Sequence, residues 1–331
     1  MSIYNFLKKQ IRVENRYFGL KRYLIIHLFF FDIKIPRNNY SKIRDYIRKY
    51  KPQLSPNVTQ IISKEKVMGH SRLAVCAIFK NEPDIVEWLE YHIAIGVQKF
   101  FLYDNESDGD VAVQLKPYID KGVVIYHKII GDVQQIPAYL DVVCRYKNCI
   151  EWLAFIDLDE YIVPIEKFSL IDFLDDYKNE VAVGINWVMF DSNGHKKRPV
   201  GFVIENYLRR DVAVHSLIKS ISKASEIAYI SNPHFCFYKN SRLAVNENYK
   251  SIGSAKTFFV PENAFVIEPS TSKIQINHYQ TKSEEDYLRK CNTGFSDRAD
   301  KRILNPDLLN FKNYSYDDKI LKYVDFLKRK E

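Results

Sequence analysis

Short apolar runs that alternate with amphipathic segments constrain the fold of this chain most strongly. The first run, "LAVCAIF" at residues 73–79, is continuously apolar and is followed by polar "KNE", the pattern of a strand buried on both faces of a parallel sheet. The next segment, "PDIVEWLEYHIAIG", has Pro83 at a helix start and Gly96 at a C-cap position. This alternation predicts βαβ units and an α/β fold with a mostly parallel sheet.

The same pattern extends along the first half of the chain and then changes. Further strands are predicted at 99–105, 122–129 and 152–156, and helices at 111–120 and 134–149. "VAVGINWVMF", from residue 181, predicts a long strand, and shorter β-like pieces follow it to about residue 278. A helix is predicted to begin at Ser283, whose hydroxyl can cap the first turn with Asp286 three residues later, and the remainder is expected to be helix and loop.

The positive charge is concentrated at the start of the chain. Residues 1–50 hold 12 Lys and Arg against three acidic residues, a surplus of nine in a chain of net charge +8, so the remainder is near neutral (8 − 9 = −1). Such a basic, aromatic-rich arm could lie on an anionic membrane surface or form a helical arm packed on the body. Nucleic-acid binding is not expected, because the body lacks a basic stripe with a recognition motif.

No membrane span, signal peptide or disulfide framework is expected. The apolar stretch "YLIIHLFFF" has about half of the roughly 20 residues that a bilayer span needs, and no small-residue cleavage site accompanies it. The five cysteines are scattered and form no C-x-x-C pair, which fits a reducing cytoplasm.

Polar clusters follow three of the predicted strands, at the edge where α/β sheets bind ligands. The clusters are Asn81 and Glu82, then Asp104, Asn105 and Asp108, and finally Asp157, Asp159 and Glu160. In "FIDLDEYIVP", Asp157 and Asp159 lie two residues apart, on the same side of an extended chain, where they can hold one hard divalent cation. The alternative is a solvated loop with a capping aspartate, but the buried strand before it makes unpaired negative charge costly.

Several segments together resemble the GT-A glycosyltransferases, and more closely glycosyltransferase family 92 and its bacterial relatives. They are "AVCAIFKNEPDIVEWLEYHIAIGVQKFFLYDNESDGD", "QQIPAYLDVVCRY", "WLAFIDLDEYIVP", "SNGH", "NPHFCFY" and "INHYQTKSEEDYLRKC", which cover roughly residues 71–295. The resemblance implies a Rossmann-like GT-A fold with helices on both faces of the central sheet. The predicted units are a basic arm (1–70), a nucleotide-sugar-binding half (71–180), an acceptor-side half (181–295) and a C-terminal helical extension (296–331).

The resemblance also implies roles for the clustered polar residues. Asn81 and Glu82 would lie beside the nucleotide, and Asp104 and Asn105 would line the base and ribose pocket. Asp157 and Asp159 would bind Mn²⁺ or Mg²⁺ that bridges the donor diphosphate, because a departing diphosphate needs its charge neutralised.

Residues of the C-terminal half would complete the site. His278 is the expected third metal ligand, with His234 as the second candidate, although either could be a hydrogen-bonded histidine in a partly buried loop. Lys282 would lie near the phosphates. For an inverting reaction, Glu205 or Asp191 would accept the proton of the acceptor hydroxyl, although each could equally be a surface carboxylate.

The resulting hypothesis is a glycosyltransferase that moves a hexose from a nucleotide sugar, expected to be a UDP-sugar, to a cell-surface or lipid-linked glycan at the cytoplasmic face of a membrane. One alternative is a metal-dependent sugar nucleotidyltransferase, but "AIFKNEPD" lacks the Gly-rich phosphate loop common in such enzymes. The other is a non-catalytic sugar-binding or scaffold protein, against which the intact pair of Asp157 and Asp159 argues.

Overall fold

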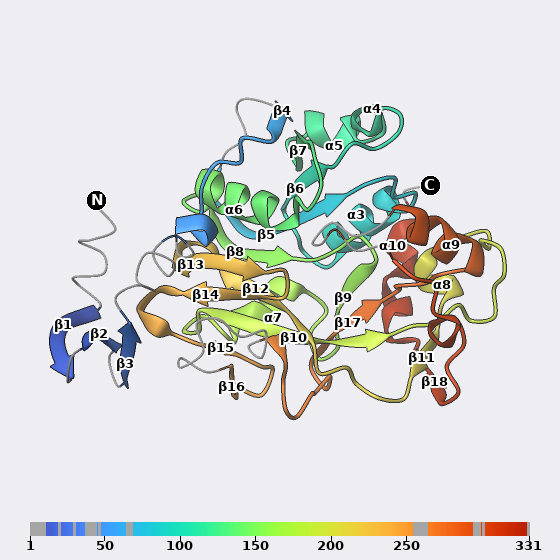
Figure 1. The fold of residues 1–331 in the computed structure, drawn as a ribbon. Helices are drawn as coiled ribbons and strands as arrows, with labels where there is room; N and C mark the ends of the chain where they lie inside the picture. The colour runs from blue at the N-terminus through green and yellow to red at the C-terminus, as the bar shows by residue number, and fades with distance from the viewer. Residues whose placement is uncertain are drawn as a thin grey trace.

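A mixed α/β body surrounds an 11-stranded sheet in this computed structural model (Figure 1). The residues that the structure describes are 11–18, 21–28, 31–36, 45, 48–63, 69–253, 264–293, 299 and 302–329. The expected α/β class, with a parallel centre to the sheet and helices on both faces, is confirmed.

Four parallel strands form the centre of the sheet in the order β8–β5–β6–β7. They are β5 (Ser71–Phe79), β6 (Lys99–Asp104), β7 (Val124–Ile129) and β8 (Ile150–Phe155), and all four match the predicted strands. Phe79 pairs with Asp104, and Cys76 pairs with Phe155. The carboxyl ends of β5, β6 and β8 therefore meet at one edge, where the polar clusters of the sequence follow them.

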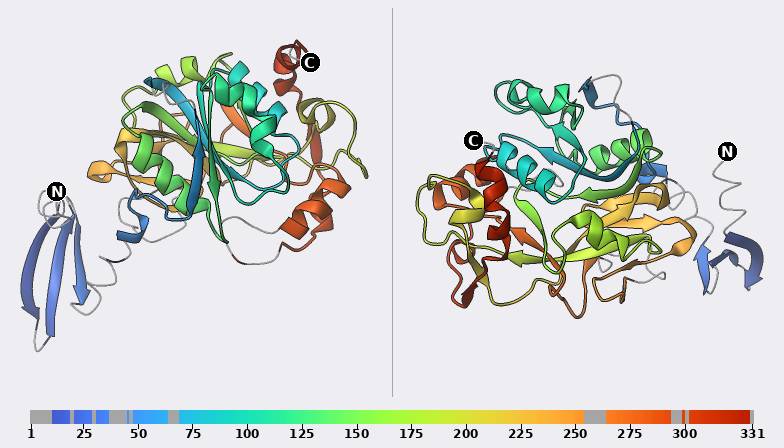
Figure 2. Two further views of the ribbon diagram at one scale, coloured as in Figure 1. Left: turned by 90° about the horizontal axis from the view of Figure 1, so that it is seen from above. Right: turned by 180° about the vertical axis from the view of Figure 1, so that it is seen from behind.

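Helices cover both faces of this sheet (Figure 2). On one face α3 (Ile85–Ala94) buries Trp88 and Leu89 in one hydrophobic cluster, and on the other α6 (Gln135–Tyr146) buries Tyr139 and Val143 in a second cluster. Gly96 follows α3 with φ +106°, as its predicted place beyond the helix end requires. The helix predicted at 111–120 is divided into α4 (Val111–Gln114) and α5 (Lys116–Asp120).

The second half of the chain extends the sheet beyond β8. Strand β12 (Ile218–Lys223) runs antiparallel between β8 and β10 (Ala182–Met189), and β17 (Ile274–His278) joins β10 to β9 (Glu160–Pro164). The predicted long strand and the helix that begins after Ser283, α9 (Glu284–Thr293), are confirmed. The Ser283 hydroxyl accepts from the Asp286 N–H at 3.1 Å, as predicted.

The remaining elements are short and lie around the sheet. They are β4 (Val58–Ile62), α7 (Leu170–Asp175), α8 (Val203–Asn206), β11 (Arg209–Asp211), β13 (Ile227–Asn232), β14 (Phe235–Tyr238), β15 (Ala244–Val245), β16 (Ser251–Ile252), β18 (Tyr314–Tyr316) and α10 (Val324–Lys328), with 3-10 turns at Ala224–Glu226, Lys239–Ser241, Pro306–Leu308 and Lys319–Tyr323.

Both ends of the chain differ in part from expectation. The described parts of residues 11–36 form an antiparallel sheet of β1 (Ile11–Phe18), β2 (Lys21–Leu28) and β3 (Phe31–Pro36), apart from the main body in Figure 2, so a helical arm is wrong for them. In the C-terminal extension, strand β18 pairs with β11, whereas only helix and loop were expected in that extension. The four unit boundaries stay predictions. Among the described residues, no helix has the length and apolar character needed to cross a membrane.

One buried carboxylate fixes the approach to β17. Glu247 is 2% exposed and accepts hydrogen bonds from the Ser272 N–H at 2.7 Å, the Lys273 N–H at 2.8 Å and the Ile274 N–H at 3.0 Å, and also from the Ser270 hydroxyl. Burial raises the pKa of Glu247, but these hydrogen bonds outweigh burial and hold it below the usual value.

We predict that Glu247→Gln lowers the free energy of unfolding by about 2–3 kcal/mol at pH 7, because a buried charged acceptor of several bonds is lost. The carboxylate contributes its full stabilisation above the unfolded-state pKa and loses it as pH falls through the lower folded-state pKa, so the two proteins should converge in acid. Urea unfolding from pH 7 to pH 3 measures this difference. Glu268→Gln is the control, because Glu268 is an exposed partner of Lys250. Equal effects of the two substitutions would contradict the prediction.

Candidate active site

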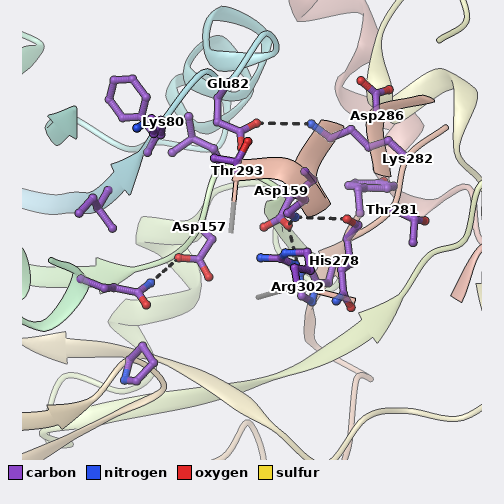
Figure 3. A pocket seen from close by; sticks show the side chains of 18 of the residues that line it. Lys80, Glu82, Asp157, Asp159, His278, Thr281, Lys282, Asp286, Thr293 and Arg302 are labelled. Carbon is purple, nitrogen blue, oxygen red and sulfur yellow. Dashed lines mark hydrogen bonds and ion pairs between the residues drawn. The ribbon is translucent and has the colours of Figure 1, made fainter. Parts of the chain in front are cut away.

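A cavity of about 360 Å³ opens at the carboxyl edge of the central strands (Figure 3). Its wall combines residues that follow β5, β6 and β8 with residues of β10, β12, β17 and α9. Among the residues predicted from the sequence, those that line it are Glu82, Asn105, Asp157, Asp159, His234, His278 and Lys282. The fold therefore brings together most of the predicted site from segments far apart in the chain.

Asp157 is the more accessible carboxylate of the D-x-D pair. It lies two residues beyond β8 with its side chain 34% exposed. Its Oδ1 accepts from Gln135 Nε2 at 2.8 Å, and its Oδ2 pairs with Lys219 Nζ at 2.9 Å. Gln135 opens α6 and Lys219 lies inside β12, so two elements orient one carboxylate.

Lys219 and Glu160 form a buried ion pair beneath the D-x-D turn. Their side chains are 1% and 0% exposed, and Lys219 Nζ lies 3.5 Å from Glu160 Oε2. The same Glu160 oxygen accepts the Asp157 N–H at 3.0 Å. Burial lowers the pKa of Lys219, but the charges of Asp157 and Glu160 outweigh burial and raise it, so the ammonium stays charged.

Asp159 shares one oxygen between two positively polarised partners. Its Oδ2 pairs with Lys290 Nζ of α9 and lies 3.4 Å from His278 Nε2 at the end of β17. Burial alone would raise the pKa of this carboxyl, but Lys290 and His278 outweigh burial and hold it well below its usual range. Asp159 is thus ionised and positioned between α9 and β17.

Lys282 forms part of the cavity wall near Glu82 (Figure 3). It adopts a positive φ of 52°, and its Nζ pairs with Asp84 and lies 4.0 Å from Glu82 Oε2. Asp84 also pairs with Arg198, which reaches Asp286 at 3.1 Å. Burial is the main cause that raises the pKa of Glu82. This network fastens the segment before α9 to the loop after β5.

Asn81 and Asp104 lie outside the cavity wall and order the loops around it. Asp104 accepts from the Ser107 N–H at 2.9 Å and from the Tyr126 hydroxyl. Asn81, at φ 54°, exchanges two hydrogen bonds with Asp108, at 2.9 and 2.7 Å. Asn105 does line the cavity, but its amide donates to the carbonyls of residues 129 and 131. Their predicted contacts with a nucleotide stay predictions.

The two predicted proton acceptors also lie outside the cavity wall. Asp191 is 1% exposed, accepts from Arg209 Nε with both oxygens at 2.9 Å, and accepts the Phe311 N–H at 2.9 Å. Glu205, in α8, pairs with Lys328 at 2.6 Å. The geometry gives Asp191 a role in anchoring the C-terminal extension, and its predicted role in proton transfer stays untested, as does that of Glu205.

Two histidines and a tryptophan meet at the β12 side of the cavity. The Trp187 ring lies 4.4 Å from the ring of His278 and 5.0 Å from that of His234. His234 Nδ1 lies 3.2 Å from the carbonyl of residue 218, and burial lowers the pKa of His234 to about 3. His234 is therefore neutral and held by the backbone, whereas His278 faces a carboxylate.

Sequence reasoning missed the basic residues that complete the cavity. They are Lys80, Lys219, Arg289, Lys290 and Arg302. Lys219 had a signal, because it interrupts the β-like run "SLIKSIS" where a buried lysine needs a partner. Lys290 had none, because its pairing with Asp159 spans 131 residues of sequence. With Lys282, these six basic groups exceed the four acidic ones in the wall, Glu82, Asp157, Asp159 and Asp286.

The donor set around Asp159 suits a divalent cation in part. Neighbouring ligand atoms of an octahedral ion with bonds of about 2.1 Å are about 3 Å apart, and Asp159 Oδ2 and His278 Nε2 are 3.4 Å apart. Within the described residues, no three His, Cys, Asp or Glu side chains converge on one metal position. Asp159 and His278 can therefore be ligands of one ion. Asp157 could be a further ligand, although its two oxygens are bonded to Gln135 and Lys219.

We predict that Lys219→Met lowers the free energy of unfolding by about 3 kcal/mol, because it leaves Glu160 buried without its cation. Adding Glu160→Gln should recover about 1–2 kcal/mol, since the stranded carboxylate is then removed. Chemical denaturation of the two single variants and the double variant measures this coupling. Purely additive losses would show that the pair does not interact in the folded protein.

Comparisons with known proteins relate this chain to one family of glycosyltransferases. The family model "Glycosyltransferase family 92" matches residues 71–309. A family 92 protein of Ricinus communis is 28% identical over 131 residues, which cover 39% of this chain and 23% of that protein. A family 92 protein of Oryza sativa subsp. japonica is 29% identical over 118 residues, which cover 35% and 20%. A galactan β-1,4-galactosyltransferase of Arabidopsis thaliana is 28% identical over 105 residues, which cover 28% and 21%.

The matches to these curated plant proteins thus span 20–23% of their length. Among solved structures, S. aureus TarS 1–349 aligns with a TM-score of 0.37 and 13% identity, covering 67% of this chain and 64% of TarS. The family model covers 239 of the 331 residues (309 − 71 + 1) and includes every wall residue of the cavity. The resemblance noted in the sequence is confirmed, and this chain belongs to glycosyltransferase family 92.

Proposed function

We propose that this chain is a glycosyltransferase that moves a hexose from a nucleotide sugar to a glycan acceptor. The observation that carries the proposal is the cavity at the carboxyl edge of parallel strands, where the D-x-D pair faces a wall with more basic than acidic groups. A nucleotide diphosphate is a polyanion, and such a wall neutralises its charge. The galactosyltransferase relative makes UDP-galactose the first donor to test.

The proposed cation is Mn²⁺ or Mg²⁺, held by Asp159 and His278 and joined by Asp157. When bound, the cation would supply Lewis-acid stabilisation of the departing diphosphate. An imidazole ligand favours Mn²⁺ over Mg²⁺, which prefers oxygen ligands. Lys219, fixed inside β12, orients Asp157, and Lys282 lies on the wall where it can contact a phosphate oxygen.

For the acceptor, we propose an inverting transfer in which a carboxylate takes the proton of the attacking hydroxyl. Glu205 fits this role better than Asp191, since the Glu205 side chain is 30% exposed whereas both Asp191 oxygens are bonded to Arg209. Motion of Lys328 away from Glu205 would free its carboxylate for an acceptor.

A panel of nucleotide sugars that includes UDP-galactose, UDP-glucose and GDP-mannose tests the proposal, with hydrolysis of each scored in Mn²⁺, in Mg²⁺ and in EDTA. We predict turnover of one UDP-hexose that EDTA abolishes and that Asp159→Asn lowers at least about a hundredfold, because the charge that holds the cation is lost. Asp172→Asn is the matched control and should be fully active, because Asp172 is an exposed residue of α7. Full activity of Asp159→Asn, or turnover that chelator leaves intact, would refute the metal assignment, and no turnover of any donor would refute the donor class.

We further propose that the basic arm places the enzyme on the cytoplasmic face of a membrane. The surplus of nine positive charges in residues 1–50 supports this, at about 1 kcal/mol per basic residue near an anionic surface. Deletion of residues 1–50 should lower co-sedimentation with phosphatidylserine vesicles severalfold and leave binding to neutral vesicles unchanged. Thermal melting of the deleted chain controls for folding. Binding that ignores both the deletion and added salt would contradict the proposal.

A further inference from the structure

Lys290 pairs with the Asp159 oxygen that a cation held between Asp159 and His278 would need. Its Nζ pairs with the same Asp159 oxygen that is 3.4 Å from His278 Nε2, and it also donates to the carbonyl of Gln280 at 3.2 Å. An ammonium and a divalent cation cannot both contact that oxygen closely, because like charges repel strongly inside a poorly solvated wall. Binding of a metal at this Asp159 oxygen therefore requires Lys290 to leave.

The two lysines of the D-x-D pair differ in their freedom to leave. Lys219 is 1% exposed inside β12, between two neighbouring strands, and pairs with both Asp157 and Glu160. Lys290 is 21% exposed on α9 and lines the open cavity. Lys219 is thus a permanent part of the sheet, whereas Lys290 can turn into the cavity by side-chain rotation alone.

The cavity also offers Lys290 a second partner when a donor is present. Asp159 and Lys290 both line it, so an anion that enters there meets the ammonium. A diphosphate would compensate the charge of Lys290 at the moment when a metal replaces it on Asp159. Lys290 is therefore paired with Asp159 in the ligand-free protein and with the diphosphate when metal and donor are bound.

We propose that Lys290 acts as an internal cation that holds Asp159 in the metal-free protein and moves to the donor diphosphate when metal binds. The inference rests on the proposed metal site at Asp159 and His278. This exchange makes metal binding and diphosphate binding cooperative. The metal displaces Lys290 from Asp159, and the diphosphate then pairs with the displaced ammonium.

The test measures binding of Mn²⁺ alone to the full chain, by electron paramagnetic resonance of free Mn²⁺, and then binding of UDP with and without Mn²⁺. Lys290→Met should bind Mn²⁺ about tenfold more tightly than the parent in the absence of UDP, a size typical of coupled sites. The same variant should bind UDP more weakly in saturating Mn²⁺, and UDP should enhance Mn²⁺ binding less than it does in the parent.

Two control variants separate this role from others. Lys290→Arg keeps the positive charge and should retain the weak Mn²⁺ binding of the parent. Lys282→Met removes a nearby charge that pairs with Asp84 rather than Asp159, so it should change Mn²⁺ binding less than about twofold if the contact with Asp159 is what matters. Melting temperatures of all variants confirm folding.

The outcomes distinguish the exchange of Lys290 from the proposed metal site at Asp159 and His278. Unchanged or weaker Mn²⁺ binding by Lys290→Met would overturn the exchange, and so would an equal gain in Lys282→Met. Mn²⁺ binding that persists in Asp159→Asn would instead overturn the metal site itself. Tighter Mn²⁺ binding by Lys290→Met that disappears when Asp159→Asn is added supports both.

Discussion

The buried ammonium of Lys219 is the interaction on which the arrangement of the active site depends. Three carboxylates within four residues, Asp157, Asp159 and Glu160, would repel one another and distort the end of β8 without an internal cation. Lys219 pairs with two of them from β12, the strand that joins the two halves of the sheet. Lys219 therefore neutralises this charge and also fixes the D-x-D turn against the second half of the sheet.

A second group of ion pairs, around Asp84, links the two halves of the chain on the other side of the cavity. Asp84 is held by Arg198 and Lys282, which come from two distant segments of the C-terminal half. Burial raises the pKa of Asp84, but these two cations outweigh burial and keep it below the usual value. The loops that follow β5 and β8 are thus bonded to the half of the chain that closes over them. Such pairs cost desolvation energy, so they are better evidence of specific positioning than of stability.

Local patterns in the sequence predicted the central strands and the helices that cover them, because burial on two faces leaves a continuous apolar run. They also predicted which residues follow the strand ends, but not which of those face the cavity. Asp104 and Asn81 satisfy loop backbone and neighbouring side chains instead, and loops need such partners as much as ligands do. Lys290 escaped prediction because a helix surface lysine has no local mark of its partner, and β12 was readable only as one of several short β-like pieces.

The balance of charge in the cavity bears on what kind of ligand completes it. Asp157 and Asp159 each have a lysine partner already, so neither carboxylate needs a metal to be stable in the folded chain. The burial argument drawn from the sequence, that unpaired charge at the strand end requires a cation, is thus met by the protein itself. The wall itself holds six basic side chains against four acidic ones, and two of the six, Lys282 and Lys219, also pair with carboxylates outside it, Asp84 and Glu160. In the proposed exchange, a metal gains its place at Asp159 only when Lys290 leaves that carboxylate for the donor diphosphate.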